Sequence, residues 1–100
     1  ITSDVTIDDA EQVNLNNVAD SIIIAGPDTL GISFYEMSES LKNEIAKADL
    51  IIAKGQANFY VFSEHKKKIN CPVVCLLRTK CHVVSSLFNF NRNINVATIL

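Results

Sequence analysis

The chain has 100 residues, of which 48% are hydrophobic and 20% are charged, and its formal net charge at pH 7 is −2. This length and composition predict one globular domain and exclude a disordered chain. The slightly acidic balance, without a basic stripe, excludes a nucleic-acid-binding protein, and no apolar run approaches the length of a membrane span.

The N-terminal half contains two helical patterns and one clear strand pattern. A short acidic helix is predicted over residues 8–13 with Thr6 as its N-cap, and residues 1–5 are expected to end a further strand. The three consecutive isoleucines at 22–24 predict a buried strand. Ser38 is a favourable N-cap for a second helix, whose apolar stripe has helical spacing at Leu41, Ile45 and Ala48.

The C-terminal half continues this alternation. The apolar runs at 50–52 and 73–77 predict two more buried strands, and residues 94–100 predict a last one. Segment 57–65 is assigned to a helix because Asn58 can act as its N-cap and because its two phenylalanines are three residues apart. Thr79 is the expected N-cap of another helix, whose buried stripe is Val83, Val84, Leu87 and Phe88.

Strands that alternate with helices indicate an α/β fold. The strand runs are continuous rather than alternating, which is typical of parallel strands covered on both faces. We therefore expect residues 1–100 to form a single α/β domain, a three-layer α/β/α sandwich with a mostly parallel, Rossmann-like sheet.

Polar residues follow each predicted strand, and ligands of open parallel sheets bind beyond the carboxyl ends of the strands. A carboxylate there can hold a divalent metal, a lysine can neutralise a phosphoryl group, and glycines let backbone N–H groups approach an anion. Together these groups suit phosphoryl transfer. In chain order the residues are Asp4 and Thr6, then Gly26, Pro27, Asp28 and Gly31, then Lys54, Gly55, Gln56 and Asn58, then Arg78, Thr79 and Lys80.

Each of these residues also has an ordinary structural explanation. A lone Lys54 at a strand end is typical of any exposed surface. Asp28 follows a proline and suits a turn, and Asp4 could cap the next helix instead of binding a metal. Only the expected convergence of the strand ends on one rim favours a binding site.

Other chemistries fit the sequence less well. A zinc site built from Cys71, Cys75, Cys81 and His82 is disfavoured, because the first two cysteines would lie more than ~12 Å apart along a strand. No P-loop or Rossmann glycine motif is present, and the lysines at 66–68 fit a solvated turn. The odd number of cysteines and the lack of a signal-peptide pattern predict reduced thiols in the cytoplasm.

Five stretches occur along the chain in the order SDVTIDDAEQVNL (3–15), IIIAGPDTLGI (22–32), ADLIIAKGQANF (48–59), CLLRTKC (75–81) and NVATIL (95–100). As a set they resemble the C-terminal half of the DUF89 family of damage-control, metal-dependent phosphatases, and KGQANF is the most specific of them. The resemblance implies that residues 1–100 are the C-terminal part of a larger domain of that family. It also implies hydrolysis of small phosphorylated metabolites, such as sugar phosphates, with a divalent manganese, cobalt, nickel or magnesium ion.

The resemblance assigns roles residue by residue. Asp4 is similar to a metal-binding aspartate of the family, and Lys54 to the catalytic lysine that faces the substrate phosphate. Gly55 and Asn58 belong to the same motif as Lys54 and are expected to bind substrate. The remaining expected substrate-binding residues are Gly26 and Asp28, in a loop that also contains Gly31.

The chain also departs from the family pattern. The family's other metal ligands lie in an Asp-Asn motif that has no counterpart in this sequence, so we expect these 100 residues to bind metal poorly and to be inactive alone. Ser3 and Tyr60 stand where family members often have an asparagine and an acidic residue. The alternative hypothesis is therefore a catalytically inactive phosphometabolite-binding or interaction module of the same fold.

Overall fold

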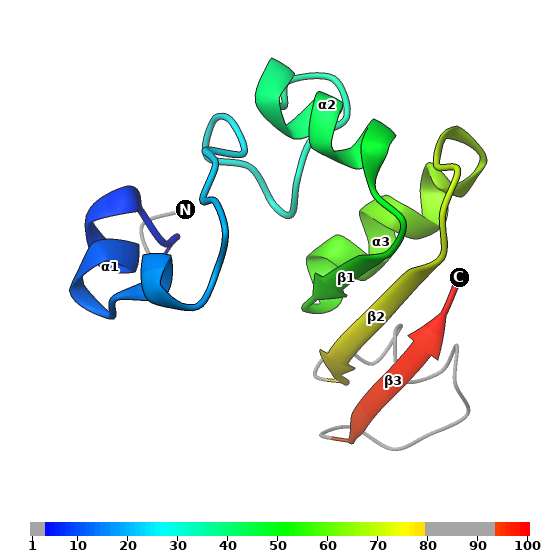
Figure 1. The fold of residues 1–100 in the computed structure, drawn as a ribbon. Helices are drawn as coiled ribbons and strands as arrows, with labels where there is room; N and C mark the ends of the chain where they lie inside the picture. The colour runs from blue at the N-terminus through cyan, green and yellow to red at the C-terminus, as the bar shows by residue number, and fades with distance from the viewer. Residues whose placement is uncertain (1–3, 80–93) are drawn as a thin grey trace.

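The computed structural model of the chain describes residues 4–79 and 94–100. Figure 1 shows a mixed α/β arrangement, in which α1 is set apart from the sheet and from the other α-helices. None of the helices in the described ranges has the length and apolar character needed to cross a membrane. The elements are α1 (Ile7–Gln12), η1 (Leu15–Asn17), α2 (Glu39–Lys47), β1 (Ile51–Lys54), α3 (Gln56–Glu64), η2 (Lys66–Lys68), β2 (Val73–Arg78) and β3 (Asn95–Ile99).

The three described strands form one sheet in the order β1-β2-β3. β1 is parallel to β2, with Ile51 opposite Val73, whereas β2 is antiparallel to β3, with Arg78 opposite Asn95. The sheet in this part of the chain is therefore mixed, and the expectation of a mostly parallel sheet is corrected. Along β3, exposed and half-buried residues alternate, as in an antiparallel strand with one solvated face.

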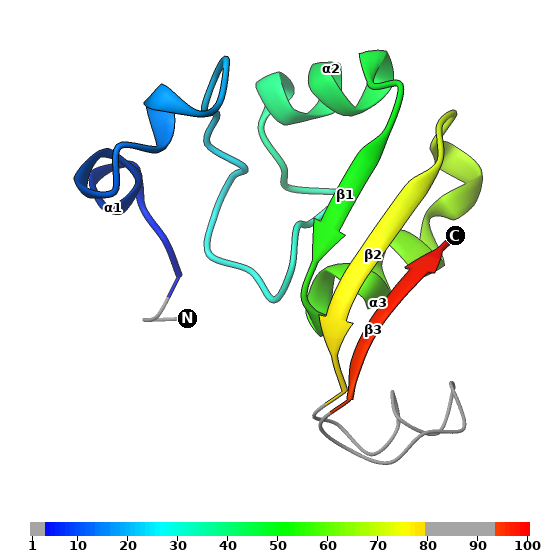
Figure 2. The same ribbon diagram turned by 60° about the horizontal axis from the view of Figure 1, so that its bottom comes forward.

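One face of the sheet carries the hydrophobic core. α3 packs on this face, and Figure 2 shows it behind the strands. Val73 and Cys75 are completely buried, and burial raises the pKa of the Cys75 thiol. The rings of Phe34 and Phe62 meet edge to face at 5.7 Å, a favourable aromatic geometry. The cluster comprises Ala53, Phe59, Phe62, Ile69, Cys71, Val73, Cys75 and Leu77.

The opposite face of the sheet is open in the described part of the chain. Side chains alternate between the two faces of a strand, so the residues between the core positions point to this side. Ile52 is 63% exposed and Ile99 is 70% exposed, and Leu76 lies between their strands. This face is apolar at its centre and ends in Lys54 and Arg78, the last residues of β1 and β2.

Of the N-cap residues expected for the three described α-helices, two are confirmed by the structure and one is wrong. Thr6 caps α1 in a capping box with Asp9, and the hydrogen bonds that Thr6 donates lower the pKa of the Asp9 carboxyl. Ser38 caps α2 by accepting from the Leu41 N–H at 3.1 Å. The expected cap of α3 was wrong, because Gly55 occupies the N-cap position and Asn58 lies inside the first turn.

The strand expected at 22–24 is not formed in the described structure. This stretch has no regular secondary structure, and Ile24 is 64% exposed. A strand exists only through hydrogen bonds to a neighbour, and none of the described strands pairs with it. Likewise Asp4 and Val5 belong to no strand. Residues 1–3 and the helix expected from 83 to 88 lie outside the described residues.

Candidate functional site

Lys54 and Gly55 lie where β1 ends and α3 begins. The Lys54 side chain is exposed, and Gly55 has φ +99°, a conformation that favours glycine. The Gly55 N–H donates to the Leu76 carbonyl at 2.8 Å, which fixes the turn against β2. Among residues 4–79 and 94–100, no side chain caps the N-terminus of α3, and a helix N-terminus carries partial positive charge. This edge of the sheet therefore favours an anion.

A cavity of about 530 Å³ opens beside Lys54 on the exposed face of the sheet. Lys54 lies opposite Leu76, and Arg78 is two residues further along β2, so both cations project from the same face. Arg78 is held by Asn95, whose Oδ1 accepts from the guanidinium Nη1 at 3.1 Å. The described lining contains two cations and no carboxylate: Lys54, Gly55, Gln56, Leu76, Leu77, Arg78, Asn95, Val96 and Ala97.

The carboxylates of the candidate site line a different cavity, of about 780 Å³, between the α1 segment and residues 22–37. Asp4, Gly26, Asp28 and Gly31 contribute to its wall, and the two aspartates are exposed. Among the described residues, no group of three or more His, Cys, Asp or Glu side chains could hold a metal ion. In this part of the chain, the expected carboxylates and Lys54 are therefore not brought into one cavity.

Asn58 connects these two regions. Its Nδ2 donates to the Lys54 carbonyl at 3.0 Å, and its Oδ1 accepts from the Ile32 N–H at 3.0 Å. Gly31 packs directly on α3, since a Cβ there would lie 3.0 Å from the Ala57 carbonyl carbon and oxygen. The side chain of Asn58 thus serves as a clamp between the end of β1 and the loop of residues 26–32.

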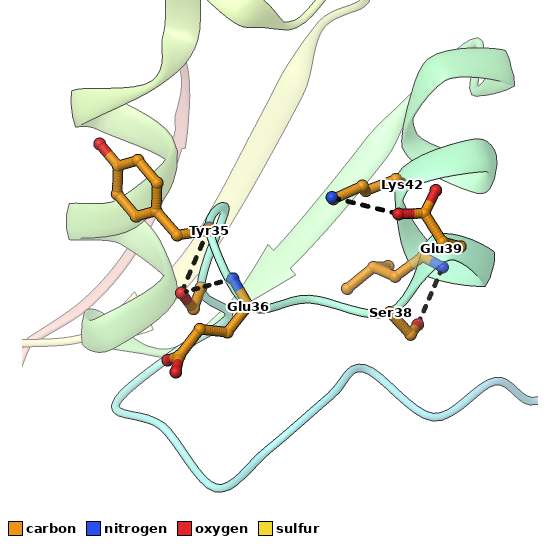
Figure 3. A network of polar contacts seen from close by, with 7 residues as sticks. Tyr35, Glu36, Ser38, Glu39 and Lys42 are labelled. Atoms are coloured by element: carbon orange, nitrogen blue, oxygen red, sulfur yellow. Dashed lines mark hydrogen bonds and ion pairs between the residues drawn. The ribbon is translucent and has the colours of Figure 1, made fainter.

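The segment after this loop is ordered by further polar contacts, and Figure 3 shows those around Tyr35, Glu36 and Ser38. Ser33 Oγ accepts from the backbone N–H groups of Tyr35 and Glu36 at 3.3 and 3.2 Å. Ser38 Oγ donates to the Ile24 carbonyl at 2.6 Å, so the start of α2 is tied back to residues 22–24. These bonds fix the course of the chain from the aspartate-lined cavity to α2.

We predict that Asn58→Ala destabilises the intact protein by about 1–3 kcal/mol, because it leaves the part-buried Ile32 N–H without its partner and also removes the exposed bond to the Lys54 carbonyl. Urea unfolding measures the loss. Asn43, an exposed residue in the middle of α2, gives the matched control Asn43→Ala, which should change stability by no more than about 0.5 kcal/mol. Equal stability of Asn58→Ala and the unsubstituted protein would contradict the clamp.

Sequence reasoning found Lys54, Gly55 and Asn58 from their position after a strand. It listed Arg78 among the strand-end residues of the expected rim but assigned it no role, and it missed Asn95. The signal for Asn95 is the antiparallel direction of β3, which brings the start of this strand to the carboxyl end of β2. Lys80, Cys81 and His82 lie outside the described residues.

The chain is similar to proteins of one family. Residues 1–96 match the model of the damage-control phosphatase ARMT1-like domain. Curated relatives include a damage-control phosphatase of Archaeoglobus fulgidus, 33% identical over 100 residues, which cover 100% of this chain and 34% of the relative. An uncharacterized protein of Methanocaldococcus jannaschii is 38% identical over 85 residues, 85% of this chain and 28% of that protein.

A solved structure supports the same relationship. The crystal structure of a DUF89 family protein from Pyrococcus horikoshii superimposes with a TM-score of 0.80 and 29% identity, covering 94% of this chain and 32% of that protein. The chain therefore spans about a third of the length of these relatives.

Proposed function

Because the chain belongs to the damage-control phosphatase ARMT1-like (DUF89) family, we propose that it forms the C-terminal part of a metal-dependent phosphatase. Its substrates are small phosphorylated metabolites, including sugar phosphates, and its site of action is the cytoplasm. Free thiols at Cys71 and Cys75 fit a reducing compartment. The chain spans a third of its relatives, so this activity belongs to the intact protein.

The observation that carries this proposal is the cavity beside Lys54. It holds two cations and, among its described lining residues, no carboxylate, and it lies next to the N-terminus of α3, where a helix carries partial positive charge. A phosphoryl group carries negative charge that grows on its oxygens as the ester bond breaks. A fixed lysine ammonium stabilises this charge more in the transition state than in the bound substrate, which is what accelerates the reaction.

Asn58, Gly31 and Gly55 hold this arrangement in place. Gly55 turns the chain so that α3 begins directly after Lys54. The Asn58 clamp joins the backbone of Lys54 to the 26–32 loop, and we assign to Gly26 and Asp28 of that loop contacts to the rest of the metabolite. Such positioning groups contribute by fixing the reacting atoms in the productive geometry.

We assign the divalent metal, of the manganese, cobalt, nickel or magnesium kind, to the neighbourhood of Asp4. A carboxylate is a suitable hard ligand, but the described residues do not complete a metal site. The remaining ligands must come from other parts of the intact protein. When bound, a metal of this kind supplies Lewis-acid stabilisation of phosphoryl oxygens.

Asp4→Asn in the intact protein is expected to reduce the bound divalent metal at least tenfold, because the amide lacks the negative charge that attracts the ion. Metal content after dialysis, measured by plasma mass spectrometry, tests this prediction. Asp49→Asn removes an exposed carboxylate just before β1 and should leave the metal content unchanged. Full metal occupancy in Asp4→Asn would remove Asp4 from the proposed ligand set.

We infer a three-layer α/β/α sandwich for the intact domain. The described sheet has one face covered by α3 and one apolar face open, with Ile52 and Ile99 largely exposed. A sheet buries both apolar faces against other elements when it forms a stable domain. Helices from the remainder of the protein are the natural cover for the open face.

The direct experiment is a panel of phosphorylated metabolites, incubated with the intact protein before and after metal removal. Release of phosphate from sugar monophosphates that requires added metal supports the phosphatase. The alternative, an inactive module that binds phosphorylated metabolites, would give saturable binding in calorimetry with no phosphate release. Neither binding nor release of any member of the panel would refute both functions.

A further inference from the structure

In the described structure, two stretches of the chain that can pair as β-strands have no partner strand, and both lie on the same side of the sheet. The first is residues 22–24, whose three isoleucines have high strand propensity. Only the end of this stretch is held, where Ser38 bonds the carbonyls of Ile24 and Ala25. In the described structure, the backbone groups of Ile22 and Ile23 make no hydrogen bond. Such an extended apolar segment can form a β-strand as soon as a neighbouring strand supplies the backbone hydrogen bonds.

The second stretch is the outer edge of β1. β1 is an edge strand, since the described sheet continues only through β2. Ile51 and Gly55 donate their N–H groups towards β2, and alternate residues of a strand direct their backbone groups to opposite sides. The N–H and C=O of Ile52 therefore point away from β2. This edge has no proline or bulge to block pairing, and the Ile52 side chain is 63% exposed.

Both stretches lie on the same side of the described sheet. In Figures 1 and 2 the light-blue to cyan segment that follows η1, which includes residues 22–24, runs on the side of β1 away from β2 and β3. The Cα radius of gyration of the chain is 14.3 Å, larger than the roughly 13 Å expected for a closed 100-residue domain. The chain is thus more open than a complete domain of this length.

We propose that the outer edge of β1 and residues 22–24 together bind one β-strand, supplied by the remaining part of the same polypeptide. The length of the relatives argues for this occupant, because the chain covers only 28–34% of the curated relatives and two thirds of such a protein is available to cover it. The inserted strand extends the sheet beyond β1 and pairs the outward-facing backbone N–H and C=O of Ile52. It also connects the aspartate-lined cavity to Lys54 through one continuous sheet.

Amide hydrogen exchange of the intact protein tests this pairing without reference to catalysis. The Ile52 amide and at least one amide among residues 22–24 should exchange at least 100-fold more slowly than the amide of Leu30, an exposed loop residue. Cys75, at the centre of the sheet, gives the protected reference. Because the unsubstituted protein is used, the result does not depend on whether a variant folds.

Fast exchange at either stretch, at the rate of Leu30, would overturn the proposal that one strand joins them. A second copy of the protein is the competing occupant, and dilution separates the two. Protection that persists in a monomer, identified by light scattering, supports a strand from the same polypeptide. Protection that disappears when a dimer dissociates would assign the edge to the second copy instead. If the intact protein releases phosphate but these amides are not protected from exchange, the proposed function stands and the proposed strand pairing is wrong.

Discussion

Replacing Lys54 by alanine in the intact protein is expected to lower kcat/KM for phosphomonoesters by about 10²–10³-fold, the usual effect of removing one charge-stabilising group from a transition state. Most of the loss should appear in kcat, because the ammonium is needed most when charge develops on the phosphoryl oxygens. Initial rates of phosphate release measure both constants. The Lys54 side chain is exposed at the end of β1, so its removal leaves the core intact.

Two variants control for this result. Lys67→Ala removes an exposed lysine from η2, which precedes β2 at the opposite end from Arg78, and should leave kcat/KM unchanged. Lys54→Arg keeps the charge but alters its shape and reach, and should recover part of the activity. Full activity of Lys54→Ala would show that this lysine does not face the reacting phosphate.

Gly31→Ala is expected to destabilise the intact protein by about 2–4 kcal/mol, because it adds a Cβ at a positive φ and against backbone atoms. Gly31 has φ +74°, and a Cβ would meet the Ala57 carbonyl carbon and oxygen at 3.0 Å. Backbone atoms cannot move aside as a flexible side chain can, so the loop must shift away from α3. Urea unfolding measures the loss of stability, and the same shift should weaken the Asn58 bond to Ile32.

Gly31→Asn separates the two causes of this loss. Asparagine tolerates a positive φ better than alanine does, but it carries the same Cβ, so it should remain destabilised if the close approach to Ala57 dominates. Leu30→Ala changes the neighbouring residue, which is 74% exposed, and should alter stability by less than about 0.5 kcal/mol. Stability of Gly31→Asn equal to that of the unsubstituted protein would show that the close contact is unimportant.

The sequence predicted those elements that local pattern determines. The strands at 51–54 and 73–78 follow from continuous apolar runs, and the helix caps at Thr6 and Ser38 follow from hydroxyl side chains ahead of a helix. The isoleucines at 22–24 have the same local pattern but form no ladder. The apolar pattern shows that a segment can form a strand. The strand itself also requires backbone hydrogen bonds to a neighbouring strand, which the described residues do not supply.

In the candidate site too, features set by local sequence could be predicted, and features that depend on distant segments could not. The position of Lys54 and Gly55 at the end of a strand was readable from the apolar run before them. The clamp made by Asn58 was not, because its partner Ile32 is 26 residues away in sequence. The hydrogen bond between Arg78 and Asn95 was hidden for a similar reason, since it depends on the antiparallel direction of β3. Contacts between distant segments carry no local signature.

The Asn58 clamp has a consequence for how substrate range could diversify in such a protein. The 26–32 loop is anchored at its C-terminal end by Gly31 and Ile32 against α3. The arc of residues 27–30 lies between that anchor and Gly26, and it faces the aspartate-lined cavity through Pro27, Asp28 and Thr29. If the proposed function holds, substitutions within the arc would reshape the wall of this cavity while Lys54 stays in place. Residues that determine which metabolite binds could then change in evolution without altering the residue that acts on the phosphoryl group.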